Sequence, residues 1–371
     1  MKKTQIIKII CALILLVTTT GCSAENKKDK VTRQEPGGSI TIIDNAGNEA
    51  GNPGVSIVRI DSYENLEISD WLDSDTLIVS KENQSLGKMS LEELSDSYPR
   101  SLYRYNLNTK EYKLLKEQKE LNLGGAKLSP DKKNLLYYGY SLGDPSYYML
   151  NIESLKSFSI SGEPIGNAGS AKWADKDTVM GAGYVNGAYS ATTEGHITSF
   201  EELDQKAVLI IEKIKDTVYY NTADDATLMA LNQSNKDIVS LGLTNVSGVY
   251  PSPDENQMLV LQYNGSKQIL LLCDRDGNNI KTIAEGIELG GVSWSPDQRM
   301  IAYSIKGDGR GTGAGSLNIY DMLTSKSTQI AVDIGNANTC WSPSGEELAY
   351  SQWDGKQYNS SIVYLEYSLQ K

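Results

Sequence analysis

The fold is decided by VSWSPDQRMIAYSI, residues 292–305, and its near copy NTCWSPSGEELAYSQ, residues 338–352. In each stretch a tryptophan precedes a Ser-Pro turn, and the segment after the turn alternates apolar and polar residues, as a half-buried strand does. The two tryptophans, Trp294 and Trp341, lie 47 residues apart. A motif repeated at this distance indicates a small sheet that recurs along the chain.

The same pattern of anchor, turn and strand occurs further upstream. A weaker copy lies around Asp216, and the spacings give a period near 45 residues. The remaining anchors are Trp71, Leu128, Trp173 and Tyr250. Two further strands separated by a polar turn follow each copy, as in SLNIYDMLTSKSTQIAV, so each unit has four strands. The sequence therefore predicts an all-β chain, a seven-bladed β-propeller of four-stranded antiparallel blades; six blades plus a divergent insertion is the alternative.

The ring has to be closed by a strand from the other end of the chain. The last repeat ends after its third strand, SSIVYLEYSLQK, and lacks a fourth. VSIVRIDS, residues 55–62, precedes the first anchor and alternates as a strand does. We expect it to complete the last blade, because an unpaired sheet edge would otherwise remain.

The turn and the strands around it support a family assignment. The WSPD turn followed by IAYS and IYD strands resembles the repeat of TolB-type β-propellers, over most of residues 66–371. TolB proteins have six blades and an additional α/β domain, for which this chain has no room. The resemblance implies the fold and leaves the role open.

The N-terminus has the features of an export signal. MKKTQIIK is basic, IICALILLV is apolar and TTTGC follows, so residues 1–21 are predicted to be a signal peptide. The Gly-Cys exit resembles a bacterial lipobox, which implies that Cys22 is acylated, for example with palmitate; an ordinary signal peptide is the alternative. Residues 22–38 are predicted to be a flexible tether, and residues 39–371 a single propeller domain. The protein is then exported and held at the cell membrane, with its domain outside the cytoplasm.

The net charge and the cysteine content limit which partners and which covalent links the protein can have. The formal net charge is −12, which disfavours nucleic acid as a partner. After removal of the signal and use of Cys22, only Cys273 and Cys340 remain. They lie in different repeats, and the sequence allows either a disulfide or two buried thiols.

No catalytic or metal-binding motif emerges. The Ser-Pro-Asp sequences recur, which favours a turn over a reactive serine, and the sole histidine, His196, lies in a polar hairpin. No Gly-x-Ser-x-Gly elbow occurs. DRDGNN, residues 274–279, and DNAGN, residues 44–48, are expected to be turns and not calcium sites. We therefore expect no enzyme activity, no metal and no cofactor.

The connections that do not repeat are better candidates for function. The connections between second and third strands emerge on one face of a propeller, and the longest are predicted at residues 81–100, 307–315 and 353–360, with 140–147 intermediate. They belong to neighbouring blades of the closed ring. Their aromatic and arginine residues are types that anchor interfaces. The predicted binding rim comprises Tyr98, Arg100, Tyr147, Arg310, Trp353 and Tyr358.

The leading prediction is an exported, lipid-anchored, non-enzymatic propeller that binds a protein, a peptide or an envelope polymer. It is expected to be a monomer. One alternative is a lyase or hydrolase that acts on a glycan with carboxylates in the central channel. Another is an accessory subunit of an export or sensing complex. The enzyme predicts a cluster of acidic and tyrosyl groups with perturbed pKa values in the channel; the binding protein predicts an apolar and aromatic patch on the long-loop face.

Overall fold

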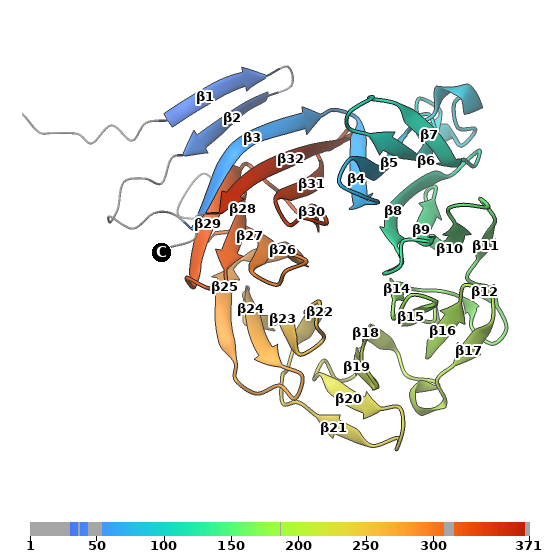
Figure 1. Ribbon diagram of the computed structural model, residues 1–371. Helices are drawn as coiled ribbons and strands as arrows, with labels where there is room; N and C mark the ends of the chain where they lie inside the picture. The colour runs from blue at the N-terminus through green and yellow to red at the C-terminus, as the bar shows by residue number, and fades with distance from the viewer. Residues whose placement is uncertain (1–29, 36–37, 44–53, 186, 308–314, 368–371) are drawn as a thin grey trace, which may run out of the picture.

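A computed structural model describes residues 30–35, 38–43, 54–185, 187–307 and 315–367. Seven four-stranded antiparallel sheets are arranged in a ring around a central channel (Figure 1). The predicted seven-bladed propeller is confirmed, and the six-bladed alternative is wrong. The predicted signal segment, Cys22, the DNAGN turn and Arg310 lie outside the described residues.

In each of the first six blades the strands follow chain order from the channel outwards (Figure 1). Blades 1 to 3 are β4 (Leu66–Trp71), β5 (Thr76–Glu82), β6 (Arg100–Asn106), β7 (Tyr112–Lys116); β8 (Asn122–Leu128), β9 (Asn134–Tyr140), β10 (Ser146–Asn151), β11 (Ser157–Ser159); and β14 (Lys172–Trp173), β15 (Thr178–Ala182), β16 (Ala188–Thr192), β17 (Ile197–Ser199). Blades 4 to 6 are β18 (Val208–Ile214), β19 (Thr217–Thr222), β20 (Met229–Asn232), β21 (Ile238–Ser240); β22 (Val246–Pro251), β23 (Gln257–Asn264), β24 (Lys267–Asp274), β25 (Lys281–Gly286); and β26 (Glu288–Trp294), β27 (Met300–Lys306), β28 (Gly315–Asp321), β29 (Lys326–Val332).

Blade 7 combines the two ends of the chain. Its inner three strands are β30 (Ala337–Trp341), β31 (Glu347–Trp353) and β32 (Tyr358–Tyr367), and its outer strand is β3 (Val55–Tyr63). The register runs from Val55 opposite Tyr367 to Tyr63 opposite Ser360. The strand expected at residues 55–62 therefore lies where ring closure requires it.

The remaining elements are small. Two-stranded sheets are formed by β1 (Lys30–Glu35) with β2 (Gly38–Ile43) and by β12 (Ser161–Gly162) with β13 (Gly166–Asn167), and 3-10 turns by η2 (Gln84–Leu86), η3 (Glu92–Leu94) and η4 (Glu201–Leu203). The β1–β2 hairpin lies outside the ring (Figure 1) and overlaps residues 22–38, the segment predicted to be a flexible tether. The β-branched residues in KVTRQE and GSITII favour strands.

The repeated turn explains why the motif recurs. In the second blade Ser129 Oγ donates a 2.8 Å hydrogen bond to Asp131 Oδ1 and accepts one of 3.0 Å from the Asn134 N–H. The fourth turn position has a positive φ, with Gly345 at 77° and Lys132 at 59° in the same left-handed region. The Ser-Pro-Asp segment is thus a structural turn between the first two strands.

The anchors join neighbouring blades. Four tryptophan indoles each donate a hydrogen bond to a backbone carbonyl of the preceding blade, which satisfies the N–H of a residue whose ring packs in the interface. The pairs are Trp71 with Cys340 (3.3 Å), Trp173 with Lys127 (2.8 Å), Trp294 with Tyr250 (3.2 Å) and Trp341 with Ser293 (3.4 Å). Blades 2 and 5 have Leu128 and Tyr250 at this position. In blade 4 strand pairing puts a charged residue there, Lys213, whose Nζ lies 3.1 Å from Asp175 Oδ2 of blade 3.

Candidate functional site

Two faces of the ring can be distinguished by their connections. Successive strands of a blade are antiparallel, so the connections from second to third strands emerge on the same side as those that lead into the next blade. We call this side the loop face and the other the turn face. The loop face includes residues 83–99, 141–145, 183–185, 187, 223–228, 265–266 and 354–357.

The aromatic part of the predicted rim is strongest in blade 7. The expected long loop at residues 353–360 is half strand, because β31 ends at Trp353 and β32 starts at Tyr358, directly opposite, so that the connection comprises only residues 354–357. Their ring centroids are 5.2 Å apart at an interplanar angle of 62°. Trp353 is 54% exposed and Tyr358 is half-buried. Trp353 and Tyr358 therefore form an edge-to-face aromatic pair at the edge of the loop face.

Arg100 lies beneath this pair and is not an exposed rim residue. It is 6% exposed, and its guanidinium carbon is 5.3 Å from the Tyr358 ring centroid. Arg100 donates to Ser80 O at 2.6 Å and to Asn65 Oδ1 at 3.0 Å. Burial lowers its pKa, while the nearby Glu67 opposes that shift. The buried arginine holds Tyr358 from below and joins blade 7 to blade 1.

The other predicted rim residues are separate from this cluster. Tyr98 is half-buried in the connection 83–99. Tyr147 is half-buried and packs edge-to-face on Tyr138, with centroids 6.4 Å apart. The structure therefore brings together Arg100, Trp353 and Tyr358, and places Tyr147 against a different aromatic residue of blade 2.

Half of the large exposed apolar side chains of the described residues lie on the loop face, distributed around the ring. Among the described residues sixteen large apolar side chains are exposed, and eight of them lie on connections or strand ends of this face. Each blade, or the connection that leads into it, contributes at least one of the eight. Three lie on the turn face and five on outer strands or their edges. The eight are Leu91, Leu142, Tyr184, Val185, Leu209, Tyr263, Ile287 and Trp353; the three are Leu155, Ile280 and Leu323.

A buried carboxyl lies between blades 1 and 2. Glu67, on β4, is 3% exposed, and its Oε1 accepts a 3.3 Å hydrogen bond from the Gly125 N–H. Burial raises the pKa of Glu67, against the opposing charges of Arg100 and Lys127. Burial and the Glu67 charge also raise the pKa of Tyr138. This is an acidic and tyrosyl cluster of the kind that the enzyme alternative predicts.

A second carboxyl lies between blades 3 and 4. Glu212 Oε2 accepts a 2.8 Å hydrogen bond from Lys172 Nζ; the Glu212 side chain is 8% exposed and that of Lys172 is 52% exposed. Burial raises the pKa of Glu212, opposed by Lys172. Both residues line a cavity of about 410 Å³, which also includes Tyr138 and Tyr147.

Sequence reasoning missed these groups, although a signal was present. Strand pairing puts one residue of each inner strand directly before the anchor. From blade 1 to blade 7 these residues are Asp70, Lys127, Lys172, Glu212, Val249, Ser293 and Cys340. Charge at this position distinguishes blades 1 to 4 from blades 5 to 7, and it includes both members of the Lys172–Glu212 pair.

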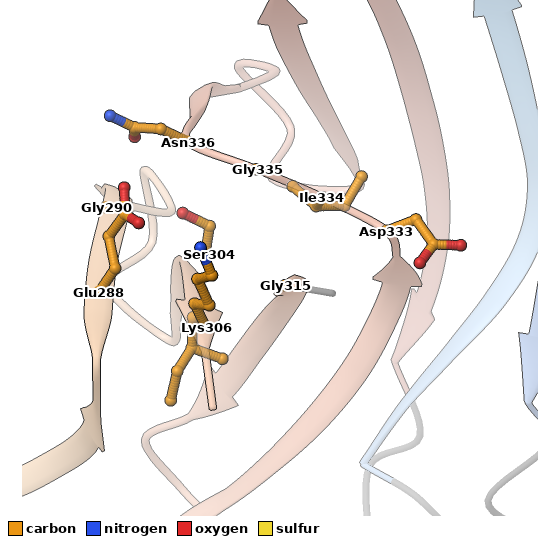
Figure 2. Close-up of a pocket in the computed structure, with 10 residues that line it drawn as sticks. Glu288, Gly290, Ser304, Lys306, Gly315, Asp333, Ile334, Gly335 and Asn336 are labelled. Carbon is orange, nitrogen blue, oxygen red and sulfur yellow. The ribbon is translucent and has the colours of Figure 1, made fainter. Parts of the chain in front are cut away.

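Another cavity, of about 350 Å³, lies on the loop face between blades 6 and 7 (Figure 2). Glu288 and Lys306 come from the first two strands of blade 6, and Asp333 and Asn336 from the connection into blade 7. The Asp333 carboxylate points away from Lys306 in Figure 2.

No triad is assembled from the described Ser-Pro-Asp segments. Their serine hydroxyls donate to the aspartates of the same turns, as Ser252 Oγ does to Asp254 Oδ1 at 2.6 Å. The His196 side chain is 78% exposed, and its Nδ1 lies 3.8 Å from Glu194 Oε2. The histidine is therefore not hydrogen-bonded to any of these serines.

The described residues contain no group of three or more His, Cys, Asp or Glu side chains arranged to hold a metal ion. In the DRDGNN turn Asn279 Nδ2 donates to Asp274 Oδ2 at 2.6 Å, and Gly277 has a φ of 74°, as in a hairpin turn. Cys273 and Cys340 are buried free thiols, and burial raises the pKa of each to about 12. Within the described part of the chain, no helix has the length and apolarity needed to cross a membrane.

Comparisons with known proteins bear on the fold. No protein-family model matches the chain, and no curated protein matches its sequence. An oligogalacturonate lyase solved in complex with manganese superposes with a TM-score of 0.61 at 12% identity, covering 91% of this chain and 96% of that one. The oligogalacturonate lyase of Vibrio parahaemolyticus gives 0.60 at 10% identity, with coverages of 84% and 97%.

TolB from Acinetobacter baumannii is also similar, with a TM-score of 0.47 at 12% identity, covering 78% of this chain and 64% of that chain. At these identities the similarities concern the propeller architecture. They do not transfer an activity, because one propeller fold supports many functions.

Proposed function

We propose that the protein is an exported, lipid-anchored binding protein that presents the loop face of its propeller to a protein, peptide or envelope polymer. The observation that carries the proposal is that half of the large exposed apolar side chains of the described residues lie on that face. A large exposed apolar residue on that face, such as Trp353, is a candidate contact for a partner. The Gly-Cys exit of the N-terminal segment supports the anchor at Cys22.

The aromatic pair of blade 7 is the best candidate for the centre of the interface. Trp353 exposes about half of its surface, and its ring is held by Tyr358, which lies above the buried Arg100. A rigid aromatic residue loses little conformational entropy when a partner covers it. Tryptophan, tyrosine and arginine are also the residues that most often dominate interface energetics.

The test is covalent crosslinking in intact cells followed by purification of the full-length protein. In the Trp353→Ala, Tyr358→Ala double variant, the yield of the specific crosslinked species is expected to fall by at least about tenfold. The matched control is Leu155→Ala, Leu323→Ala, which removes exposed apolar side chains from the turn face. Equal crosslinking by the wild type and both double variants would reject the loop face as the binding surface.

The anchor is tested separately by cell fractionation. Cys22→Ala is expected to move the protein from the membrane to soluble fractions, because a chain without acyl groups has no lipid anchor. Continued membrane retention of this variant would show that lipidation is not the tether, without affecting the binding proposal.

A glycan-acting enzyme is the second candidate, favoured by the buried carboxyls Glu67 and Glu212. Burial raises the pKa of each, as in carboxyl groups that act as general acids. The solved oligogalacturonate lyases share the fold, so uronate oligomers are the first substrates to assay. Cleavage by the wild type that is lost in Glu212→Gln would support this candidate; no cleavage would favour the binding protein.

A further inference from the structure

The cavity of about 350 Å³ between blades 6 and 7 lies where other pairs of blades are joined by a side chain. In blades 1, 4 and 7 the second strand has a polar residue three positions after the residue that pairs with the anchor. Each of these side chains donates a hydrogen bond to a carbonyl on the inner strand of the next blade. The bonds are Ser80 to Leu123 O (2.6 Å), Asn221 to Val246 O (2.8 Å) and Ser351 to Ile68 O (2.8 Å).

Ser304 has the same position in blade 6 but makes no such bond. Trp294 pairs with Ile301, and Ser304 follows three residues later. The residue is 4% exposed, and its hydroxyl has no hydrogen-bond partner among the described residues. It lines the cavity and points between Glu288 and Asn336 (Figure 2). The hydroxyl that would join blades 6 and 7 is therefore available, as a donor and as an acceptor, to a ligand.

The charges at the cavity balance each other. Glu288 and Lys306 lie directly opposite each other on β26 and β27, with one charge of each sign. Asp333 is exposed, and its carboxylate points away from Lys306 (Figure 2). The described lining therefore has no excess positive charge for an acidic ligand. Ser304 and Asn336 add neutral donors and acceptors, which suits a neutral ligand that carries hydroxyl groups.

The size and the other walls of the cavity suit one ring of such a ligand. Its volume is at the small end of the range of about 300–1,000 Å³ that is typical of small-ligand sites. Ile305 and Ile334 contribute apolar wall. The Asn336 amide lies over Gly290, where a Cβ would be only 2.5 Å from Asn336 Oδ1. Only glycine at residue 290 leaves room for the amide in this place.

The cavity and the aromatic pair of blade 7 lie on either side of the same strand end. Gln352 Oε1 accepts a 3.3 Å hydrogen bond from the Gly335 N–H, and Gly335 belongs to the cavity lining. Successive side chains of a strand point to opposite sides. The next residue, Trp353, therefore faces away from the cavity and packs on Tyr358. A ligand that contacts both has to be a chain that crosses the end of β31.

Sugar rings suit both contacts. A pyranose has hydroxyl groups at its edge, which can bond to Ser304 and Asn336, and C–H groups on its faces, which pack on an indole. We propose that the loop face binds a neutral glycan chain, with one sugar ring in the cavity between blades 6 and 7 and a neighbouring ring on Trp353. This inference rests on the proposed function, because it names the polymer that the loop face binds.

A glycan array probed with the full-length protein tests the class of ligand. The array carries neutral hexamers of glucose, mannose, galactose and N-acetylglucosamine, and charged hexamers of galacturonate and glucosamine. At least one neutral hexamer is expected to bind at least about tenfold more tightly than either charged hexamer, because the cavity has no unbalanced charge to pair with them. Binding of charged hexamers alone, or of no hexamer, would reject the proposal.

Variants locate the site by calorimetry with the neutral hexamer that binds best. Ser304→Ala removes a hydroxyl without a protein partner, so the affinity should fall about three- to tenfold while the melting temperature stays unchanged. Asn221→Ala is the matched control, because it breaks the equivalent contact between blades 4 and 5. Its melting temperature should fall while its affinity stays unchanged. Equal affinity of Ser304→Ala and the wild type would overturn the proposed site.

Failure of this inference can be told apart from failure of the proposed function. If no neutral hexamer binds but the crosslinked species in cells still depends on Trp353 and Tyr358, the partner is a protein or peptide and the glycan inference is wrong. If a neutral hexamer binds, Trp353→Ala is expected to weaken it by at least about tenfold. Unchanged affinity in this variant would overturn the contact of the second ring with Trp353.

Discussion

Blades 1 to 4 and blades 5 to 7 differ at one position of an otherwise shared repeat. The residue before the anchor is charged in the first group, as in Lys127 and Glu212, whereas it is Val249, Ser293 or Cys340 in the second. The strand pairing at this position is antiparallel in both groups. The repeat therefore sets the architecture, and the charged residues of blades 1 to 4 depart from it.

The anchors themselves do not distinguish the two groups. Trp71 in blade 1 and Trp341 in blade 7 are both buried and both donate an indole hydrogen bond to the preceding blade. A residue type that recurs at several interfaces between blades is poorly suited to select one ligand. This contrast directs functional tests to the inner strands of blades 1 to 4 and to the loop face.

Deletion of β3 should have the largest effect, because it tests whether the two groups of blades are one cooperative unit. Removing Val55–Tyr63 leaves β32 with an unpaired edge and opens the ring. We expect loss of the single unfolding transition of the whole domain, measured by calorimetry and circular dichroism. Deletion of the β1–β2 hairpin, residues 30–43, is the matched control. An unchanged transition without β3 would contradict ring closure.

Truncation of an anchor tryptophan should lower the free energy of unfolding by the same amount in both groups of blades. Trp71→Ala and Trp341→Ala each remove a large buried ring, which typically costs about 3–5 kcal/mol of unfolding free energy. Denaturant titrations with Trp353→Ala as an exposed control provide the measurement. A large loss in only one of the two core variants would show that the anchors are not equivalent.

The smallest stability effect concerns Glu67, a buried carboxyl of blade 1 that lies outside the position before the anchor. Burial raises the pKa of Glu67 above 4.5, so the folded state binds this proton more tightly than the unfolded chain. The wild type therefore loses stability as pH rises from about 4.5 through the folded pKa. Glu67→Gln should lack this loss and be more stable than the wild type at neutral pH, on the order of 1 kcal/mol.

The control for that effect is Glu92→Gln, at an exposed glutamate of the connection 83–99. Thermal unfolding of the three proteins is compared at several values of pH. If the difference between Glu67→Gln and the wild type stays constant from pH 4 to pH 8, Glu67 does not have the raised pKa that its burial implies.

Most of the fold could be predicted because the turn has a fixed local chemistry. The Ser-Pro-Asp hydrogen bonds involve residues that are close in sequence, and their recurrence gave the number of blades and the need for a closing strand. The β1–β2 hairpin was not predicted, because the polar composition of residues 22–38 indicated a tether. The whole segment 353–360 was expected to be a loop. The pairing of Trp353 with Tyr358 extends the β31–β32 ladder into this segment, and the local sequence alone does not show that extension.

The candidate functional residues were harder to predict, because their contacts join residues that are not adjacent in the sequence. Arg100 was expected on the rim, but its guanidinium bonds to the buried Ser80 and the half-buried Asn65, contacts that only the folded blade 1 supplies. Glu67 and Glu212 are single acidic residues within strands and carry no motif. Aligning the repeats at the position before the anchor would have revealed Glu212, whereas Glu67 lies outside that position.

The most direct test of the account is site-specific photocrosslinking on the two faces of the full-length protein in intact cells. A photoreactive residue is placed at Lys356, in the turn between Trp353 and Tyr358, or at Leu323 on the turn face. The account predicts a discrete adduct from position 356 that disappears with Trp353→Ala, and none from position 323. Adducts of equal yield from both positions, or from position 323 alone, would contradict it.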